Sequence, residues 1–104
     1  MIRHGIEMDS EAIRAFCRKW KIKELSVFGS ILRDDFRADS DVDFLADYED
    51  DAEWDLFDHM DMEEELEGII EHKADILDRP TMQNHDNWLL RKAIFSTEEK
   101  VYAG

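Results

Sequence analysis

The hydrophobic positions in the first part of the chain follow the spacing of an amphipathic helix. One face of that helix would carry four residues spaced three or four apart: Ile13, Phe16, Cys17 and Trp20. The dipeptide Asp9–Ser10 comes just before them, and both residue types favour the N-cap of a helix. The pattern therefore predicts a helix that begins after this dipeptide and packs through its apolar face.

Three short runs have the composition and alternation of β-strands. They are Glu24–Phe28, Asp41–Ala46 and Lys73–Leu77. The first run ends at Gly29–Ser30, and the residues that follow, Ile31–Arg33, predict a short helical turn. The third run is expected to stop before the Arg-Pro pair that follows it, because proline cannot donate a backbone hydrogen bond to a sheet.

A long helix is predicted between the second and third strands, after an acidic loop from Asp47 to Asp55. Its apolar side is expected to hold Trp54, Phe57, Met60, Leu66, Ile69 and Ile70. The last helix is predicted in the tail, from Asn84 to Ile94, with Trp88, Leu89 and Ile94 as its anchors in the core. Val101–Tyr102 could add a short strand at the edge of the sheet.

The resulting order, α-β-α-β-α-β-α, is typical of a small α/β domain. At 104 residues the chain has room for one hydrophobic core. We therefore expect a single domain over residues 1–104.

The composition narrows the classes of partner. Acidic residues outnumber basic ones by 27 to 13, which gives a formal charge of −14. This charge repels phosphate backbones and argues against nucleic-acid binding, whereas it suits cationic proteins and divalent metals. Cys17 is the only cysteine, so neither a disulfide framework nor a thiolate zinc cluster is expected. No apolar run approaches the ~20 residues of a membrane span, and we expect a soluble, cytoplasmic protein.

The most informative pair of residues is Asp41 and Asp43. On a strand, side chains at positions i and i+2 point to the same face, so both carboxylates would project together while Val42 and Phe44 face the core. Two like charges held close together are costly. A divalent cation offsets that cost, and oxygen-only ligands favour a hard ion such as Mg²⁺ or Mn²⁺.

Asp75 is a third candidate ligand, because it interrupts another apolar strand. If the two strands are neighbours, Asp75 would complete a three-carboxylate cluster able to hold two metal ions. Such a pair of ions can stabilise both the attacking and the leaving oxygen of a phosphoryl displacement.

A candidate phosphate site precedes the carboxylates. Gly29 lets the backbone approach a ligand closely, and Ser30 stands at the start of the predicted turn, where backbone N–H groups favour anions. Arg33 adds a guanidinium that suits phosphate.

Each of these features also has an ordinary structural explanation. An Asp-x-Asp sequence is often a solvated loop, and an aspartate such as Asp75 on an edge strand often points to solvent. Arg33 could simply pair with Asp34 or Asp35 on the surface. The combination of features, rather than any single one, favours a metal-dependent site.

The combination resembles the nucleotidyltransferase superfamily related to DNA polymerase beta, whose pattern is Gly-Ser, then Asp-x-Asp, then a third strand carboxylate. Gly29–Ser30, Ser40–Asp43 and Asp75 carry the resemblance. The short length and the run Val27–Phe36 point to its minimal nucleotidyltransferase branch, the MntA-like antitoxins. The chain departs from the pattern at Asp34, where many relatives have glycine, and has only alanine before the third aspartate.

The resemblance implies a small mixed sheet flanked by helices and specific roles for these residues. Asp41 and Asp43 would coordinate two Mg²⁺ ions, and Asp75 would bind the catalytic ion and help deprotonate the acceptor. ATP would be the substrate, with its β- and γ-phosphates held by Ser30, Arg33 and the backbone around Gly29.

Minimal members of this family are often encoded beside HEPN-domain ribonuclease toxins. By resemblance, the chain is expected to be an antitoxin that transfers AMP from ATP to a tyrosine of its toxin, in a hetero-oligomer with that toxin. The alternative is an antitoxin that neutralises its toxin by binding alone. Transfer to a small molecule is disfavoured, because relatives of that kind carry a further domain for the acceptor.

Overall fold

A four-stranded mixed sheet organises the fold, in the order β5-β4-β3-β6. The computed structural model describes residues 2–104. The central strands β3 (Ile22–Phe28) and β4 (Val42–Tyr48) are antiparallel, and β6 (Glu99–Ala103) is antiparallel to β3. The outer strand β5 (Ala74–Asp78) is parallel to β4. The expected α/β class with a mixed sheet is therefore confirmed.

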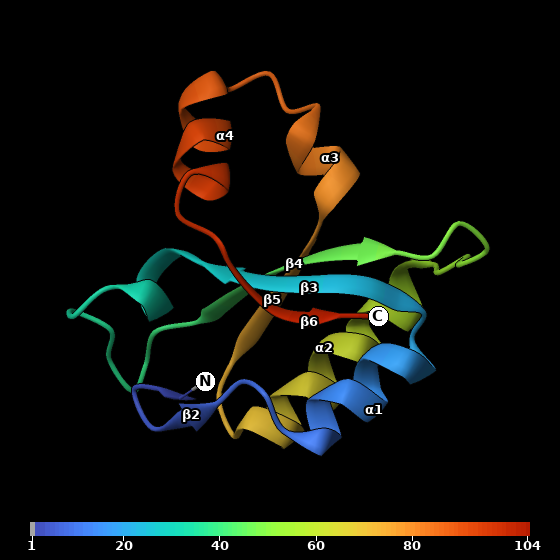
Figure 1. The fold of residues 1–104 in the computed structure, drawn as a ribbon, viewed down its shortest axis with the longest axis horizontal. Helices are drawn as coiled ribbons and strands as arrows, with labels where there is room; N and C mark the ends of the chain where they lie inside the picture. The colour runs from blue at the N-terminus through green and yellow to red at the C-terminus, as the bar shows by residue number, and fades with distance from the viewer. Residues whose placement is uncertain (1) are drawn as a thin grey trace.

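Two helices, α1 (Glu11–Lys19) and α2 (Leu56–Ile70), cover one face of the sheet (Figure 1). The side chain of Ser10 accepts the backbone N–H of Ile13 and caps α1 as the sequence predicts. At the start of α2, Asp55 and Asp58 each accept the other's backbone N–H, which forms a capping box.

The main core lies between this pair of helices and the sheet. On β4 the side chains alternate, so that Val42, Phe44 and Ala46 are completely buried on the helix side. Asp43 and Leu45 therefore face the opposite side of the sheet. The predicted separation of Val42 and Phe44 from the carboxylates is thus observed.

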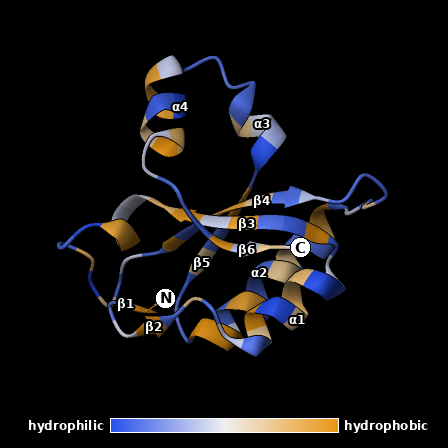
Figure 2. Cartoon of the chain, in the orientation of Figure 1, coloured by the Kyte–Doolittle hydropathy of each residue, from blue (hydrophilic) through white to orange (hydrophobic). Residues whose placement is uncertain are grey.

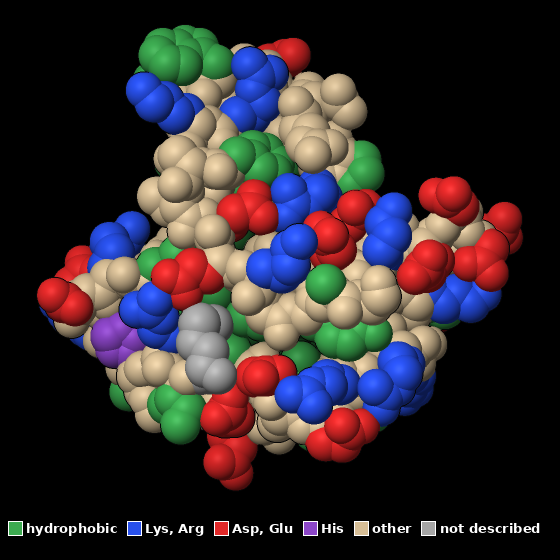
Figure 3. All heavy atoms as spheres, in the orientation of Figure 1, with side chains coloured by type: hydrophobic (Ala, Val, Ile, Leu, Met, Phe, Trp, Pro, Cys, Tyr) green, Lys and Arg blue, Asp and Glu red, His purple; other side chains and the backbone are tan. Residues whose placement is uncertain are grey.

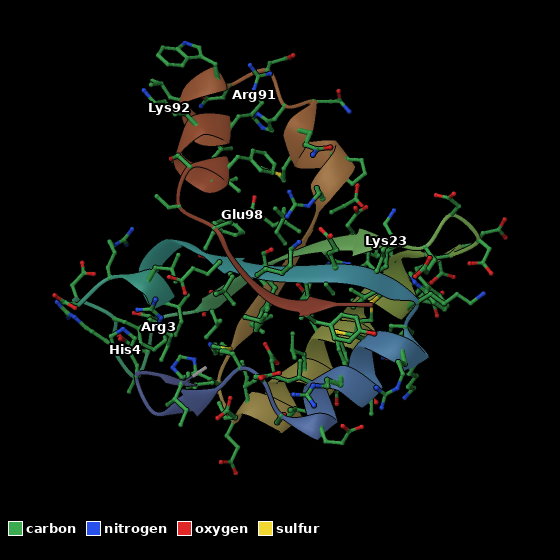
Figure 4. All side chains as sticks on the ribbon, viewed as in Figure 1. Arg3, His4, Lys23, Arg91, Lys92 and Glu98 are labelled. Atoms are coloured by element: carbon green, nitrogen blue, oxygen red, sulfur yellow. The ribbon has the colours of Figure 1, made fainter. Side chains whose placement is uncertain are left out.

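The opposite face of the sheet carries a small arm made of α3 (Arg79–Gln83) and α4 (Trp88–Phe95), seen above the sheet in Figure 1. A second apolar cluster attaches the arm to the sheet and consists of Phe28, Leu45, Met82 and Ile94. Arg79 also pairs with Glu98, at 3.2 Å between its Nη1 and the carboxylate Oε2. Glu98 lies between the arm and the sheet (Figure 4).

Two expected sets of core anchors were wrong in part, although Leu66, Ile70 and Ile94 are buried as expected. Phe57 and Met60 are 74% and 56% exposed, because an α-helix turns by roughly 100° per residue and places them opposite the buried stripe of α2. That stripe holds Met62, Leu66 and Ile70. In α4 only Ile94 is buried, whereas Trp88 and Leu89 are about 60% exposed. Apolar residues on several sides of a helix do not show which side faces the core.

Several element boundaries also differ from the sequence prediction. The second strand begins at Val42 and continues to Tyr48, so the acidic loop starts two residues later than expected. Helix α3 was missed because Pro80 was interpreted only as a stop, although proline is favoured in the first turn of a helix. A hairpin of β1 (Ile2–Arg3) and β2 (Ile6–Glu7) was also missed.

No helix within residues 2–104 has both the length and the apolar character required to cross a membrane. Figure 2 shows instead that hydrophobic and hydrophilic residues alternate along the helices.

Cys17 is expected to be inert in the folded protein. Its side chain is completely buried in α1, and this burial raises the pKa of the thiol to about 12. Because the thiolate is the reactive form, reaction with a disulfide reagent should be about a thousandfold slower in the native protein than in urea. Absorbance of the released chromophore measures this rate, with Cys17→Ala as the blank. Fast stoichiometric labelling of native protein would contradict this packing.

Candidate active site

Two of the predicted carboxylates lie side by side on neighbouring strands. Asp43 of β4 and Asp75 of β5 are direct partners in the parallel register of the two strands. Both therefore project from the face of the sheet that carries the arm. Asp41 comes immediately before β4 rather than within it, so its position depends on the loop as well as on the sheet.

The electrostatics show that these groups act on one another. The pKa of Asp43 is raised to about 6, first by burial and then by the negative charges of Asp75 and Asp41. The cation of Arg33 opposes this shift and lowers the pKa. The four side chains thus form one electrostatic cluster at the start of β4. Ionised Asp43 is held there at a cost that positive charge would relieve.

The carboxylates are near one another without forming a closed cage. Across residues 2–104, no three His, Cys, Asp or Glu side chains are close enough together to hold a metal ion as they stand. Mutual repulsion of like charges favours side-chain orientations that spread the oxygens apart. The donor set nevertheless fits a divalent ion, because carboxylate oxygens are the ligands of Mg²⁺, and both strands present them to the same space.

Gly29 brings the backbone directly against this cluster. It follows β3 and begins the short 3-10 helix η1 (Gly29–Leu32), with a positive φ of 77°. A Cβ atom at this position would lie 2.7 Å from Oδ2 of Asp43. Only glycine tolerates a positive φ at a place where a Cβ atom would have so little space. The position of the Asp43 carboxylate therefore requires glycine at residue 29.

Ser30 ties the same turn to the first aspartate. Its hydroxyl donates to the backbone carbonyl of Asp41 at 3.3 Å. The predicted helical turn is present, but it runs from Gly29 to Leu32 rather than over Ile31–Arg33, and its first residues lie next to the carboxylates. The hydroxyl is engaged with the backbone in this arrangement, so it would have to rotate in order to meet a phosphate.

Arg33 is exposed and forms an ion pair on the surface, which is what we expect of an arginine without a role in binding. Its Nε lies 3.2 Å from Oδ1 of Asp35. An exposed pair of this kind contributes little to stability, so it does not lock the guanidinium in place. Arg33 also borders the cavity described next, which keeps it a candidate for binding a ligand.

A cavity of about 640 Å³ opens beside Gly29 and Arg33. Its other walls come mainly from α4, which contributes Leu90, Ala93 and Ile94. The remaining lining residues are Phe28, Leu32, Thr97 and Glu99. The volume is in the range of small-molecule sites. The sequence did not indicate the contribution of α4, because nothing in the apolar pattern of the tail showed that it packs beside the Gly-Ser turn.

This arrangement agrees with a known family. The sequence profile described as "Nucleotidyltransferase domain" matches residues 9–102. The chain belongs to this nucleotidyltransferase family.

Individual nucleotidyltransferases extend the comparison. The chain is 30% identical over 66 residues to the protein adenylyltransferase MntA of Thermococcus cleftensis, a match that covers 64% of this chain and 65% of the relative. The chain thus spans less than two thirds of that relative.

Solved structures show the same fold. A structure described as a minimal nucleotidyltransferase has a TM-score of 0.63 and 28% identity, covering 86% of this chain and 85% of its own. A Shewanella oneidensis complex, described as a tri-AMPylated HEPN toxin with its MNT antitoxin, has a TM-score of 0.59 and 14% identity. It covers 88% of this chain and 67% of the matched one.

Proposed function

We propose that this nucleotidyltransferase is an antitoxin that transfers AMP from ATP to a tyrosine of a HEPN ribonuclease toxin. The observation that carries the proposal is the pairing of Asp43 with Asp75 on neighbouring strands, directly beside the backbone of Gly29. The MntA relative is named as a protein adenylyltransferase, and the Shewanella complex joins an AMPylated HEPN toxin to its antitoxin. Both support extending this activity to the present chain.

In this proposal the carboxylates hold Mg²⁺. Asp41 and Asp43 would contact two ions, and Asp75 would contact the one nearer the acceptor. When bound, the ions offset the negative charge that grows on the departing diphosphate. A need for three oxygen donors would explain why Asp41, Asp43 and Asp75 are kept in one electrostatic cluster despite the cost of their like charges.

The triphosphate would lie along the turn that follows β3. The backbone of Gly29, the hydroxyl of Ser30 and the guanidinium of Arg33 would hold its β- and γ-phosphates. This orientation directs the α-phosphate towards Asp43, because the backbone of Gly29 adjoins that carboxylate. The nucleoside would then lie at the end of the ATP molecule opposite to the β- and γ-phosphates. We also propose a cytoplasmic location, because ATP is abundant there.

The transfer itself needs a deprotonated acceptor. A tyrosine hydroxyl has a pKa of about 10, so Asp75 is proposed to draw its proton as the phenolic oxygen attacks the α-phosphorus. The bond between that phosphorus and the bridging oxygen breaks, and diphosphate leaves with that oxygen. The products are AMP-tyrosine, diphosphate and one proton, and no covalent enzyme intermediate is required.

Incubation with ATP labelled at the α-phosphate tests this function. Purified protein, Mg²⁺ and the HEPN-domain protein of the same genome should give label on the HEPN protein, at a tyrosine identified by mass spectrometry. ATP labelled at the γ-phosphate should give no labelled protein. An inhibited but unlabelled HEPN protein would refute the enzymatic proposal and show that neutralisation occurs by binding alone.

A further inference from the structure

The arm carries a charge opposite to that of the rest of the molecule. Residues 79–95 contain three basic residues and one acidic residue, which give this segment a formal charge of +2. The remaining residues carry −16, so the net charge of the whole chain is −14. Helix α4 itself contains Arg91 and Lys92 and no acidic residue. A cationic segment on so acidic a chain is not explained by solubility, which the overall charge already provides.

Among residues 2–104, the cations of α4 also lack acidic partners. Nine of the 13 Lys and Arg side chains form ion pairs with carboxylates among residues 2–104. In the same described part of the chain, neither Arg91 nor Lys92 does so. Arg91 donates instead to the backbone carbonyl of His85 at 2.7 Å. Both cations lie towards the end of the arm that is distant from the sheet (Figure 4).

Large apolar side chains accompany these cations. Trp88 is 60% exposed and Leu89 is 61% exposed. Figure 3 shows hydrophobic and basic side chains together at the tip of the arm, whereas acidic side chains are frequent over the lower part of this face. Tryptophan and arginine are the residues most enriched at the energetic centres of protein interfaces.

The position of α4 relates this surface to the active site. Ile94 of α4 packs with Phe28 and Leu45 on the face of the sheet that also carries Asp43. The inner side of α4 forms a wall of the cavity beside Gly29 and Arg33. A protein bound to the outer side of α4 would therefore be separated from this cavity by a single helix.

We propose that the outer face of α4, formed by Trp88, Leu89, Arg91 and Lys92 and called here the α4 patch, docks the acceptor protein. This inference rests on the proposed transfer to a protein hydroxyl. The partner surface would hold an apolar hollow for the indole and leucine side chains, with carboxylates on its rim to pair with the two cations. The acceptor hydroxyl would lie beyond this rim, within reach of Asp75.

A second copy of this chain is a poorer occupant. To cover the positively charged α4 patch, the second copy would have to offer an apolar surface with negative charge. The start of α2 has this character, because Leu56, Phe57 and Met60 are exposed there beside acidic residues. That surface belongs to a helix on the other face of the sheet. Pairing α4 of one copy with α2 of the next would be a head-to-tail contact, which extends into a chain of subunits unless its rotation closes a ring.

The test uses the double variant Trp88→Ala/Lys92→Glu. We expect its affinity for the HEPN-domain protein of the same genome to fall by about 30-fold or more, measured by calorimetry. The matched control, Phe57→Ala/Met60→Glu, removes equally exposed apolar groups from α2 and should bind within twofold of wild type. Binding of a fluorescent ATP analogue should be unchanged in both variants, because neither alters the Gly-Ser turn or the carboxylates.

The outcomes separate docking from catalysis. Equal binding of the HEPN protein by wild type and the α4 variant would overturn the docking proposal. So would a wild-type dimer that the α4 variant converts to monomer, because the patch would then be covered by a second copy. A complex that depends on the α4 patch but shows no AMP transfer would refute the proposed enzymatic activity and leave the docking surface supported.

Discussion

Replacing Asp43 with alanine is expected to reduce AMP transfer about a thousandfold or more. Asp43 is the central member of the cluster, since it pairs with Asp75 and lies against Gly29. Removing a group that stabilises charge in the transition state commonly costs two to three orders of magnitude. Because Asp43 is proposed to bind both metal ions, its loss should reach the upper end of this range. The measurement is the initial rate of labelling from ATP labelled at the α-phosphate.

The same substitution should leave the fold intact or more stable. The raised pKa of Asp43 shows that burial and the charges of Asp75 and Asp41 disfavour its ionised form. Removing that charge relieves the repulsion, so the melting temperature of Asp43→Ala should equal or exceed that of wild type in metal-free buffer. A fall of many degrees would indicate a structural role and count against a metal site.

Two controls make this result specific. Asp47 lies on the same face of β4 as Asp43, four residues further along the strand. Asp47→Ala removes this carboxylate and should retain AMP transfer. Mg²⁺ should raise the melting temperature of wild type by mass action and have no such effect on Asp41→Ala/Asp43→Ala. Equal shifts in the two proteins would show that the ion binds elsewhere.

Gly29→Ala is expected to disable the site by a different route. A positive φ costs a non-glycine residue about 1 kcal/mol or more, and the added methyl group would lie 2.7 Å from Oδ2 of Asp43. Relief of this contact requires either the turn or the carboxylate to move. We expect a melting temperature lower by at least about 5 °C, together with loss of binding of a fluorescent ATP analogue.

Gly68→Ala is the matched control for this substitution. Gly68 lies within α2, and a Cβ atom there would meet nothing within 4 Å. Alanine favours a helix interior over glycine by about 1 kcal/mol, so this variant should be stabilised. Gly29→Ala/Asp43→Ala should lose less stability than the sum of the two single changes, because the carboxylate that causes the close contact is absent. Full additivity of the two changes would show that the contact does not limit the turn.

The sequence predicted the central strands, and the face of β4 that carries Asp43, because those signals are local. Alternation along Asp41–Ala46 assigned Val42 and Phe44 to the core and Asp43 to the opposite face, as observed. The pairing of Asp43 with Asp75 depends on two strands being neighbours, which no local pattern determines. The resemblance to nucleotidyltransferases supplied this step, and the register of β4 and β5 agrees with it.

Sequence reasoning failed where packing selects between apolar sides of a helix. The apolar residues of α4 point in several directions, and the arm buries Ile94 while exposing Trp88. Only the position of the arm over Phe28 and Leu45 determines this choice. The same limit hid the wall of the cavity formed by Leu90 and Ala93.

The unequal attachment of the two faces of the sheet has a dynamic consequence. Helices α1 and α2 share a large continuous core with the strands, whereas the arm is held by four buried residues and the pair between Arg79 and Glu98. Segments with few buried contacts open at a lower free energy than the whole domain. We therefore expect the arm to open at a lower free energy than the strands that carry Asp43 and Asp75. Such opening would let bulky molecules enter and leave without unfolding the domain.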